Sequence, residues 1–408
     1  MSRSKIQLLA MMAKCTLSLG LGLGLRKIQP NVLKSNVFTS AGQEYSGFPS
    51  TLMSYRSRML HEKHPTLFKR RTKSAKRVLN QLPSTTAEES ETLSQIQVLQ
   101  DMLFRIRQCN HVPYLIEQNL LDFEVEGNVV GKTNPFFAAK LEATPFFAIE
   151  TEKCLNKPIL TLTQEAGSTE SERTTSVNTV MKKLATEGVI KGWRDEFYPV
   201  ISSFYDEKVP LLVERASAPH LGVQSYGVHV NGYVKDNISG MPKKMWMARR
   251  SRTKSKYPGM LDHIVAGGQP YGMSPMQNVI KECEEEAGIP RELAIKARST
   301  GAVSYEYYSE GGSTGSNQSG TIERACLFCY DLELPPDFVP KAIDGEVEEF
   351  FLWDFEQIVA SMSPSCADPI KPNCYLVIID FLLRWGFITP ESPGYLDVLR
   401  ELRSGKCS

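Results

Sequence analysis

The stretch that decides the fold reads Gly267-Gly-Gln-Pro-Tyr-Gly-Met-Ser-Pro-Met-Gln-Asn-Val-Ile-Lys-Glu-Cys-Glu-Glu-Glu-Ala-Gly-Ile289. It carries signals for the start and the end of a helix. Ser274 can cap the N-terminus, Pro275 suits the first helical position, and Gln277 completes a capping box with Ser274. Gly288 supplies the left-handed residue at which many helices end. The sequence therefore predicts one well-defined helix after a glycine-rich turn.

The predicted helix has an apolar stripe and a carboxylate stripe on opposite sides. At about 100° per residue, the apolar side chains share one direction to within about 50°: Met276, Val279, Ile280, Cys283 and Ala287. The opposite side carries Glu282, Glu285 and Glu286, whose like charges repel by roughly 0.2–0.5 kcal/mol per pair at these spacings. Mg²⁺ prefers carboxylate oxygens and often shares its coordination sphere with substrate phosphates, so this crowding indicates a magnesium site. A solvated helix face is the alternative, and carboxylate spacing alone favours it.

The spacing of the whole segment resembles the Nudix box. That motif consists of Gly, five residues, Glu, seven residues, Arg-Glu, an aliphatic residue, any residue, Glu-Glu, any residue, Gly and an aliphatic residue. The positions in register here are Gly267, Glu282, Glu285, Glu286, Gly288 and Ile289. The resemblance implies that the three glutamates bind a metal and that Glu285 and Glu286 act in catalysis. It assigns the box loop to Gly267, Gly268 and Gly288, and it implies an α+β fold, an α/β/α sandwich with a mixed sheet.

Two positions depart from this motif. Met273 replaces the usual first glutamate, and Lys281 replaces the usual arginine. In the family these two residues mainly brace the loop and the helix. Their replacement leaves the metal-binding carboxylates intact, but it leaves open how the loop is braced and how fast hydrolysis runs. It motivates an alternative hypothesis, in which the protein is a non-catalytic Nudix-fold module that binds a phosphorylated ligand.

The resemblance extends from about residue 104 to the C-terminus. There the chain is similar to plastid Nudix hydrolases of plants and to the Nudix branch related to thiamin pyrophosphokinase. The stretches that carry this similarity are Glu214–Pro219, Tyr226–Tyr233, Tyr257–His263, Leu327–Leu334 and Glu391–Tyr395. The branch implies a hydrolase of phosphorus-containing acid anhydrides that uses Mg²⁺ or Mn²⁺ and acts on small-molecule diphosphates. Oxidised thiamin-diphosphate-like compounds and nucleoside diphosphate derivatives compete as substrates, and the residues do not decide between them.

Further site candidates lie outside the box. Arg249 and Arg250 begin a basic run that ends at Lys256 and could bind a diphosphate, with a solvated loop as the alternative. Glu346 is the candidate for the catalytic base, because a further acid often serves the metal or acts as base in this family. His263 ends a predicted strand, where a histidine is usually satisfied by hydrogen bonds, so we assign it no role.

Composition and periodicity divide the chain into a basic leader, a linker, a smaller α+β domain and a Nudix domain, at residues 1–77, 78–94, 95–215 and 216–408. The linker contains a polar, acidic run of turn-forming residues. The α+β domain is predicted to begin with a helix at 96–106 and to contain a hairpin at 123–130. The Nudix domain is predicted to contain paired strands at 302–308 and 325–334 and a buried helix at 375–385.

Charge is distributed unevenly along the 408 residues. The total is +1, but residues 1–77 carry 15 Lys and Arg against two acids, and the rest of the chain carries −12. This negative main part argues against nucleic acid as a partner. The basic, Ser-rich leader is typical of an organellar transit peptide. The family resemblance favours the chloroplast over the mitochondrion as its destination.

A secretory signal and a membrane anchor are the alternative interpretations of the leader. Ile6–Leu25 is mostly apolar and just long enough to span a bilayer. Lys14 would lie near the membrane centre at a cost of roughly 2.5–3.5 kcal/mol, and the Gly-Leu alternation after it forms helix poorly. We therefore expect no stable membrane insertion.

The chain contains nine cysteines, an odd number scattered along its length. This pattern argues for reduced thiols over a disulfide framework. Cys326 and Cys329 have metal-ligand spacing, but they lie in a predicted buried strand and no second pair follows them. We interpret them as core residues, because a zinc site needs four ligands. The sequence leaves the oligomeric state open.

Overall fold

The computed structural model describes residues 87–152, 157–310 and 320–405, all within the unit Pro83–Ser408. The expected leader at 1–77 and most of the expected linker lie outside the described residues. No helix in the described ranges is long and apolar enough to cross a membrane.

The upstream domain is built on a sheet with the strand order β2-β1-β4-β3. In it β1 is parallel to β4, and the other neighbours are antiparallel. Its elements are α4 (Tyr114–Glu117), β1 (Leu121–Val125), β2 (Asn128–Thr133), α5 (Pro135–Glu142), β3 (Phe147–Glu152), β4 (Lys157–Leu162), η1 (Gln164–Ala166), α6 (Glu170–Thr186) and the hairpin of β5 (Phe197–Val200) and β6 (Leu211–Glu214). The predicted β1–β2 hairpin is confirmed, and its Phe123 packs in the core with Val177 and Leu184 of α6.

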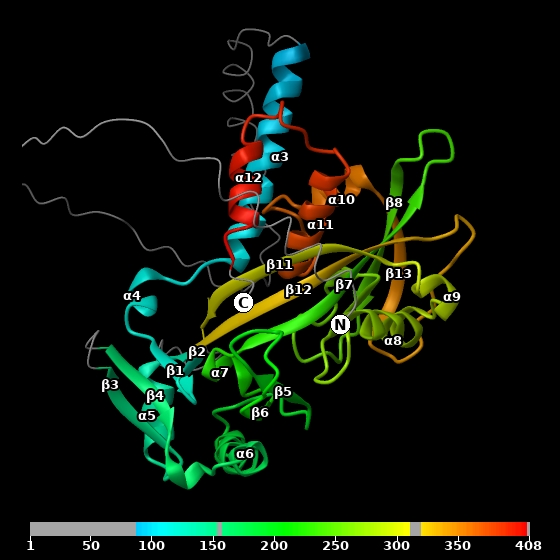
Figure 1. Cartoon of the computed structure of the whole chain (residues 1–408). Helices are drawn as coiled ribbons and strands as arrows, with labels where there is room; N and C mark the ends of the chain where they lie inside the picture. Colours follow the sequence, from blue (N-terminus) through cyan, green and yellow to red (C-terminus); the bar gives the residue numbers. More distant parts are fainter. Residues whose placement is uncertain (1–86, 153–156, 311–319, 406–408) are drawn as a thin grey trace, which may run out of the picture. The chain divides into compact units, whose positions relative to one another are not determined.

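The C-terminal domain is built on a mixed sheet that has seven strands among the described residues, with the main order β11-β12-β7-β8-β13 (Figure 1). β10 pairs with β7, β9 pairs with β8, and β12 runs parallel to β7. The strands are β7 (Gln224–Lys235), β8 (Pro242–Arg250), β9 (Leu261–His263), β10 (Val265–Gly268), β11 (Arg298–Ser309), β12 (Thr321–Glu333) and β13 (Val347–Asp354). The predicted pairing of the strands at 302–308 and 325–334 is confirmed.

Helices cover both faces of this sheet. Successive residues of β8 show this, because Trp246 packs in one core with α8 while Met245 and Met247 pack in another with α11. The helices of this domain are α7 (Ala218–Leu221), α8 (Pro275–Ala287), α9 (Arg291–Ala294), α10 (Phe355–Ser361), α11 (Pro372–Arg384) and α12 (Tyr395–Leu402). The expected α/β/α sandwich and the buried helix near the C-terminus are both confirmed. Cys326 and Cys329 are buried in β12, as expected of core residues.

Helix α3 (Ala87–Cys109) differs from the sequence-based expectation in its start and in its partner. It begins inside the range expected to be a linker. Its apolar side chains, among them Leu99, Met102 and Ile106, lie in the core that contains α11 rather than in the core of the upstream domain. Figure 1 shows α3 alongside α12, and both α11 and α12 contact it. The first helix of the domain expected at 95–215 therefore packs with the C-terminal sandwich. An apolar stripe in the sequence indicates that one face of a helix is buried, but it does not indicate which element covers that face.

Candidate active site

Helix α8 begins and ends where the sequence predicts. The hydroxyl of Ser274 accepts a hydrogen bond from the backbone N–H of Gln277, and the side chain of Gln277 accepts one from the N–H of Ser274. Gly288 ends the helix in the left-handed conformation, with φ of 59°. These end signals fix the register of the three glutamates against the preceding strand β10.

Glu286 is buried, with an exposed fraction of 7%. Its Oε2 accepts a hydrogen bond from the backbone N–H of Ala266 in β10 at 2.9 Å. Burial raises the pKa of this carboxyl group to about 8; the hydrogen bond from Ala266 opposes the shift and the charge of Glu282 reinforces it. A solvated helix face therefore does not describe Glu286. A divalent cation would supply the positive charge that favours its ionised form.

Glu282 is confined between the helix and the turn before it. Its side chain is 13% exposed, and burial raises its pKa although Lys281 opposes the shift. A β carbon on Gly267 would lie 2.3 Å from Cδ of Glu282, closer than real contacts allow. Glycine is therefore required at position 267, because any other residue would displace the carboxylate.

Lys281 holds the two outer carboxylates together. Its Nζ lies 2.6 Å from Oε2 of Glu285 and 3.3 Å from Oε1 of Glu282. The side chain of Glu285 is 52% exposed, so exposure rises from the buried Glu286 through Glu282 to Glu285. Lys281 neutralises both carboxylates here, and a hard cation such as Mg²⁺ or Mn²⁺ that binds their oxygens would have to displace it.

Two amide side chains brace the box loop where the family uses a glutamate. Nε2 of Gln269 donates to the carbonyl oxygen of Met273 at 2.5 Å, and Nδ2 of Asn278 donates to that of Gly268 at 2.9 Å. The side-chain oxygens of both amides are buried and have no hydrogen-bond partner among the described residues. Buried acceptors of this kind are usually satisfied by water or a ligand. The loop is thus braced although Met273 replaces the usual glutamate, and the side-chain oxygens of Gln269 and Asn278 remain available as hydrogen-bond acceptors.

Glu346 lies immediately before β13, and its charge acts on Glu282 and Glu286. Its carbonyl oxygen accepts a hydrogen bond from the N–H of Ser251 at 2.8 Å, and its carboxylate forms an ion pair with Lys254. Burial is the main cause of the raised pKa values of Glu282 and Glu286, and the charge of Glu346 adds to both shifts. The fold therefore brings the expected base close to the expected metal ligands, across a long stretch of sequence.

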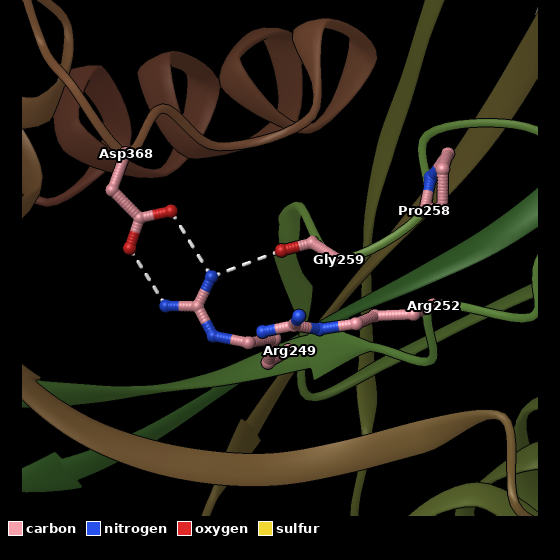
Figure 2. A pocket seen from close by; sticks show the side chains of 5 residues that line it. All are labelled: Arg249, Arg252, Pro258, Gly259 and Asp368. Carbon is pink, nitrogen blue, oxygen red and sulfur yellow. Dashed lines mark hydrogen bonds and ion pairs between the residues drawn. The ribbon is translucent and has the colours of Figure 1, made fainter.

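The two arginines expected to bind a diphosphate bind protein groups instead. Arg249 forms a bidentate ion pair with Asp368, at 2.7 and 3.0 Å, and donates to the carbonyl oxygen of Gly259 (Figure 2). Arg250 donates to Asp262 at 2.6 Å, and its remaining donor groups bond to backbone carbonyl oxygens at 256 and 257. These contacts give both arginines a structural role in holding the loop at 251–260.

A pocket of about 600 Å³ lies beside this loop. Figure 2 shows the residues that line it: Arg249, Arg252, Pro258, Gly259 and Asp368. None of the box glutamates is among them, so this pocket is separate from the carboxylate cluster.

A second group of potential metal ligands is fully buried. Its ligand atoms lie within 4.8 Å of one another and belong to His229, Asp262, His263 and Cys374. Asp262 accepts hydrogen bonds from Arg250 at 2.6 Å, Lys371 at 3.3 Å and the thiol of Cys374 at 2.7 Å. Burial alone would raise the pKa of Asp262, but Lys371 and Arg250 hold it below its ordinary value. Because these two cations neutralise the carboxylate and would repel a metal ion, we interpret the group as a structural hydrogen-bond network.

His263 is satisfied by hydrogen bonds inside this network, as the sequence suggests for a strand-end histidine. Its Nδ1 lies 3.0 Å from Nδ1 of His229, and its Nε2 lies 3.1 Å from Oδ1 of Asn231. Burial lowers the pKa of His263 to about 4, so it is neutral at physiological pH. A neutral imidazole that is enclosed by these hydrogen bonds is not available for a reaction at the surface.

Sequence reasoning missed two residues that lie at the box loop. A β carbon on Gly268 would lie 2.8 Å from Oη of Tyr198 and 3.9 Å from Nη2 of Arg215. Tyr198 belongs to β5, and Arg215 directly follows β6, so both come from the upstream domain. The one available signal was that Arg215 lies in the stretch Glu214–Pro219, which carries part of the family resemblance.

Known protein families match both domains. Residues 236–374 match the NUDIX domain family. Residues 101–225 match a family described as a domain of unknown function, DUF4743. The second match covers most of the upstream domain, and the first covers the box together with Glu346.

Similar proteins share much of this length. Nudix hydrolase 20, chloroplastic, of Arabidopsis thaliana is 49% identical over 237 residues, which are 58% of this chain and 59% of that protein. Nudix hydrolase 24, chloroplastic, of the same plant is 48% identical over 242 residues, 58% of this chain and 61% of that protein. The chain thus spans about three fifths of the length of these relatives. A solved Ap4A hydrolase of C. elegans is 14% identical over 40% of this chain and 99% of its own, with a TM-score of 0.27, and carries no argument at that score.

Proposed function

We propose that this chain, whose residues 236–374 match the NUDIX domain family, is a metal-dependent hydrolase that cleaves the diphosphate linkage of a small molecule. The observation that carries the proposal is the group of glutamates on α8, Glu282, Glu285 and Glu286. Its inner member is buried and favours its neutral form in the absence of a cation. Its outer members share the single positive charge of Lys281.

The three glutamates would hold Mg²⁺ or Mn²⁺. When bound, such an ion neutralises charge on the diphosphate and favours attack of water on phosphorus. The chain fixes the positions of its own oxygens. The N–H of Ala266 orients Glu286, and the missing side chain of Gly267 leaves room for Glu282.

We propose Glu346 as the base that accepts a proton from the attacking water. Its backbone is held by the hydrogen bond from Ser251, and its carboxylate is 46% exposed and accessible to water. Its ion pair with Lys254 would have to open as the proton arrives. Glu285 and Glu286 would take part in the reaction as ligands of the metal.

Two substrate classes remain in competition. Oxidised thiamin-diphosphate-like compounds are suggested by the resemblance to the thiamin-related branch. Nucleoside diphosphate derivatives, such as nucleotide sugars and ADP-ribose, fit the same carboxylate site. The names of the similar Arabidopsis proteins support a chloroplast location, which agrees with the basic leader.

The experiment that tests the proposal measures product release by the full chain. Its substrates are thiamin diphosphate, an oxidised thiamin diphosphate, ADP-ribose and a nucleotide sugar, each with Mg²⁺, Mn²⁺ or EDTA. We expect one class to be cleaved only with metal. Binding of a diphosphate without cleavage of any would contradict the proposal and favour the non-catalytic module.

A further inference from the structure

The β5–β6 hairpin carries a cationic side chain to the edge of the carboxylate site. Nη2 of Arg215 lies 3.9 Å from the position that a β carbon on Gly268 would take. A β carbon on the preceding Gly267 would likewise lie against the carboxylate of Glu282. Consecutive Cα atoms are about 3.8 Å apart and successive side-chain directions alternate, so the guanidinium and the carboxylate lie on opposite faces of the same strand end.

A buried acid holds Arg215 in place. Glu214 has no exposed surface, and its carboxylate accepts hydrogen bonds from the backbone N–H of Arg194 at 2.7 Å and of Ala216 at 2.6 Å. Its own N–H donates to Oδ1 of Asn178 at 2.9 Å. A buried carboxylate is costly unless it is hydrogen-bonded, so these bonds are strongly favoured. They fix the backbone on both sides of Arg215 and thus the direction of its Cα–Cβ bond.

Only part of the Arg215 guanidinium donates hydrogen bonds to other described residues. Nη1 donates to Oε2 of Glu196 at 2.7 Å, and the group lies 5.6 Å from the centre of the Tyr198 ring. Nη2 has no hydrogen-bond partner within the described ranges, and 36% of the side chain is exposed. A guanidinium with free donors at a fixed position is well suited to phosphate oxygens.

We propose that Arg215 is a substrate-binding residue that holds a phosphoryl group of a diphosphate at the edge of the site formed by Glu282, Glu285 and Glu286. The inference rests on the proposed function. It gives the upstream domain a part in the reaction, because the substrate then contacts a residue that lies outside the segment matched by the NUDIX family.

The charge of Glu346 acts both on Arg215 and on the box glutamates. Burial opposes the charged form of Arg215, yet Tyr198, Glu196 and Glu346 together raise its pKa. The same carboxylate contributes to the raised pKa values of Glu282 and Glu286. A ligand that reaches from the glutamates to Arg215 would therefore pass the expected base.

The test measures binding of methylenediphosphonate, a diphosphate analogue with a carbon bridge that cannot be hydrolysed. The full chain is titrated in a calorimeter in the presence of Mg²⁺. Arg215→Gln is expected to raise Kd about 10- to 100-fold, because it removes charge-assisted hydrogen bonds. Arg215→Lys keeps the charge, so its Kd should lie between that of the wild type and that of Arg215→Gln. Arg400→Gln, at an exposed arginine that pairs with Asp397, is the matched control and should leave Kd unchanged.

Glu196→Gln separates binding from a purely structural role. If Arg215 only braces the hairpin through its ion pair, Glu196→Gln should weaken binding as much as Arg215→Gln does. We expect instead that Glu196→Gln binds the analogue at least as tightly as the wild type, because it releases Nη1 for the ligand. Equal losses in both variants, or an unchanged Kd in Arg215→Gln, would overturn the inference.

Hydrolysis separates this inference from the proposed function. With a cleaved substrate, Arg215→Gln should raise KM by a similar factor with a smaller change in kcat. Cleavage with an unchanged KM would overturn the role of Arg215 and leave the hydrolase intact. Binding that depends on Arg215 without any cleavage would contradict the hydrolase and keep the phosphate-binding role. A wild-type chain that does not bind the analogue would overturn the role of Arg215.

Discussion

Gly267 and Glu282 are packed so closely that a β carbon on the glycine would lie 2.3 Å from Cδ of the glutamate and 2.6 Å from its Oε1. The contact joins the end of β10 to the carboxylate side of α8. It gives the first glycine of the box a steric function: the absence of its side chain creates the space in which the carboxylate stands. The number of residues that the motif sets between these two positions is thus the number that the chain needs to bring the end of the strand against the helix.

Gly267→Ala should therefore displace the Glu282 carboxylate. We expect kcat/KM for the preferred diphosphate to fall about tenfold or more, since a carboxylate moved by one ångström no longer meets the ion correctly. Thermal unfolding should change little. The control is Ser171→Ala, at an exposed position of α6 outside the box. A Gly267→Ala variant as active as this control would show that Glu282 does not need its observed position.

Glu214→Ala should lower the free energy of unfolding by about 2–4 kcal/mol, because the backbone N–H groups of Arg194 and Ala216 lose their acceptor. Glu214→Gln keeps one acceptor oxygen and should cost less. Urea unfolding followed by circular dichroism measures both changes. Glu165→Ala, at an exposed position of the same domain, should stay within about 0.5 kcal/mol of the wild type. Equal stability of Glu214→Ala and the wild type would remove the anchor that we assign to Arg215.

The pKa of His263 predicts a loss of stability in acid. Burial holds this pKa at about 4, whereas an unfolded histidine has its ordinary value of 6.5. Between these values the unfolded chain binds a proton that the folded chain does not. The stability that His263 contributes is therefore complete above pH 6.5 and is lost as the pH falls toward 4, by about 3 kcal/mol.

His263→Asn should flatten this dependence. The measurement is the free energy of unfolding from pH 7 to pH 4 in both proteins. The neighbours His229, Asp262 and Cys374 remain in the variant, so the difference in slope reports the loss of the His263 imidazole together with its effect on the pKa of His229. His111→Asn, at an exposed histidine, should keep the wild-type slope. Parallel curves for the wild type and His263→Asn would contradict a neutral, buried His263.

Metal removal should affect hydrolysis and fold differently. EDTA should abolish diphosphate cleavage, and added Mg²⁺ should restore it, because we propose that the box glutamates hold the ion that the reaction needs. The melting temperature should fall only by the small amount that loss of a weakly bound ion causes. Elemental analysis of the purified protein should find no stoichiometric zinc. Zinc at one ion per chain, with a large drop in melting temperature on its removal, would show that the His229–Cys374 group is a metal site.

Local signals made the centre of the fold predictable. The ends of α8 are coded by Ser274, Gln277 and Gly288, which act within a few residues of themselves. The helix period places the glutamates on one side of the helix. Their order of burial could not be predicted, because it depends on where β10 lies. The strand pairs and the C-terminal helix were predictable from runs of apolar residues. The leader could be interpreted from composition alone and lies outside the described residues.

Long-range partners were not predictable. The stripe of α3 indicated a buried helix, but its contacts with α11 are made across more than half of the chain. Arg249 and Arg250 were candidates for binding a diphosphate because the sequence does not show that the fold places Asp368 and Asp262 against them. Arg215 was overlooked for the converse reason, since nothing near it in sequence places it against Gly268. A charged side chain reveals its role only when the fold supplies its neighbours.

The most direct test of the account compares two neighbouring glutamates of α8 in the full chain. Glu285 is an expected metal ligand, and Glu284 beside it is exposed on the same helix. With Mg²⁺ and the preferred diphosphate, Glu285→Gln should lower kcat/KM at least about 100-fold, which corresponds to about 3 kcal/mol of transition-state stabilisation. Glu284→Gln should match the wild type, and both variants should keep the wild-type circular dichroism. Equal activity of Glu285→Gln and Glu284→Gln would contradict the metal site on which the account is built.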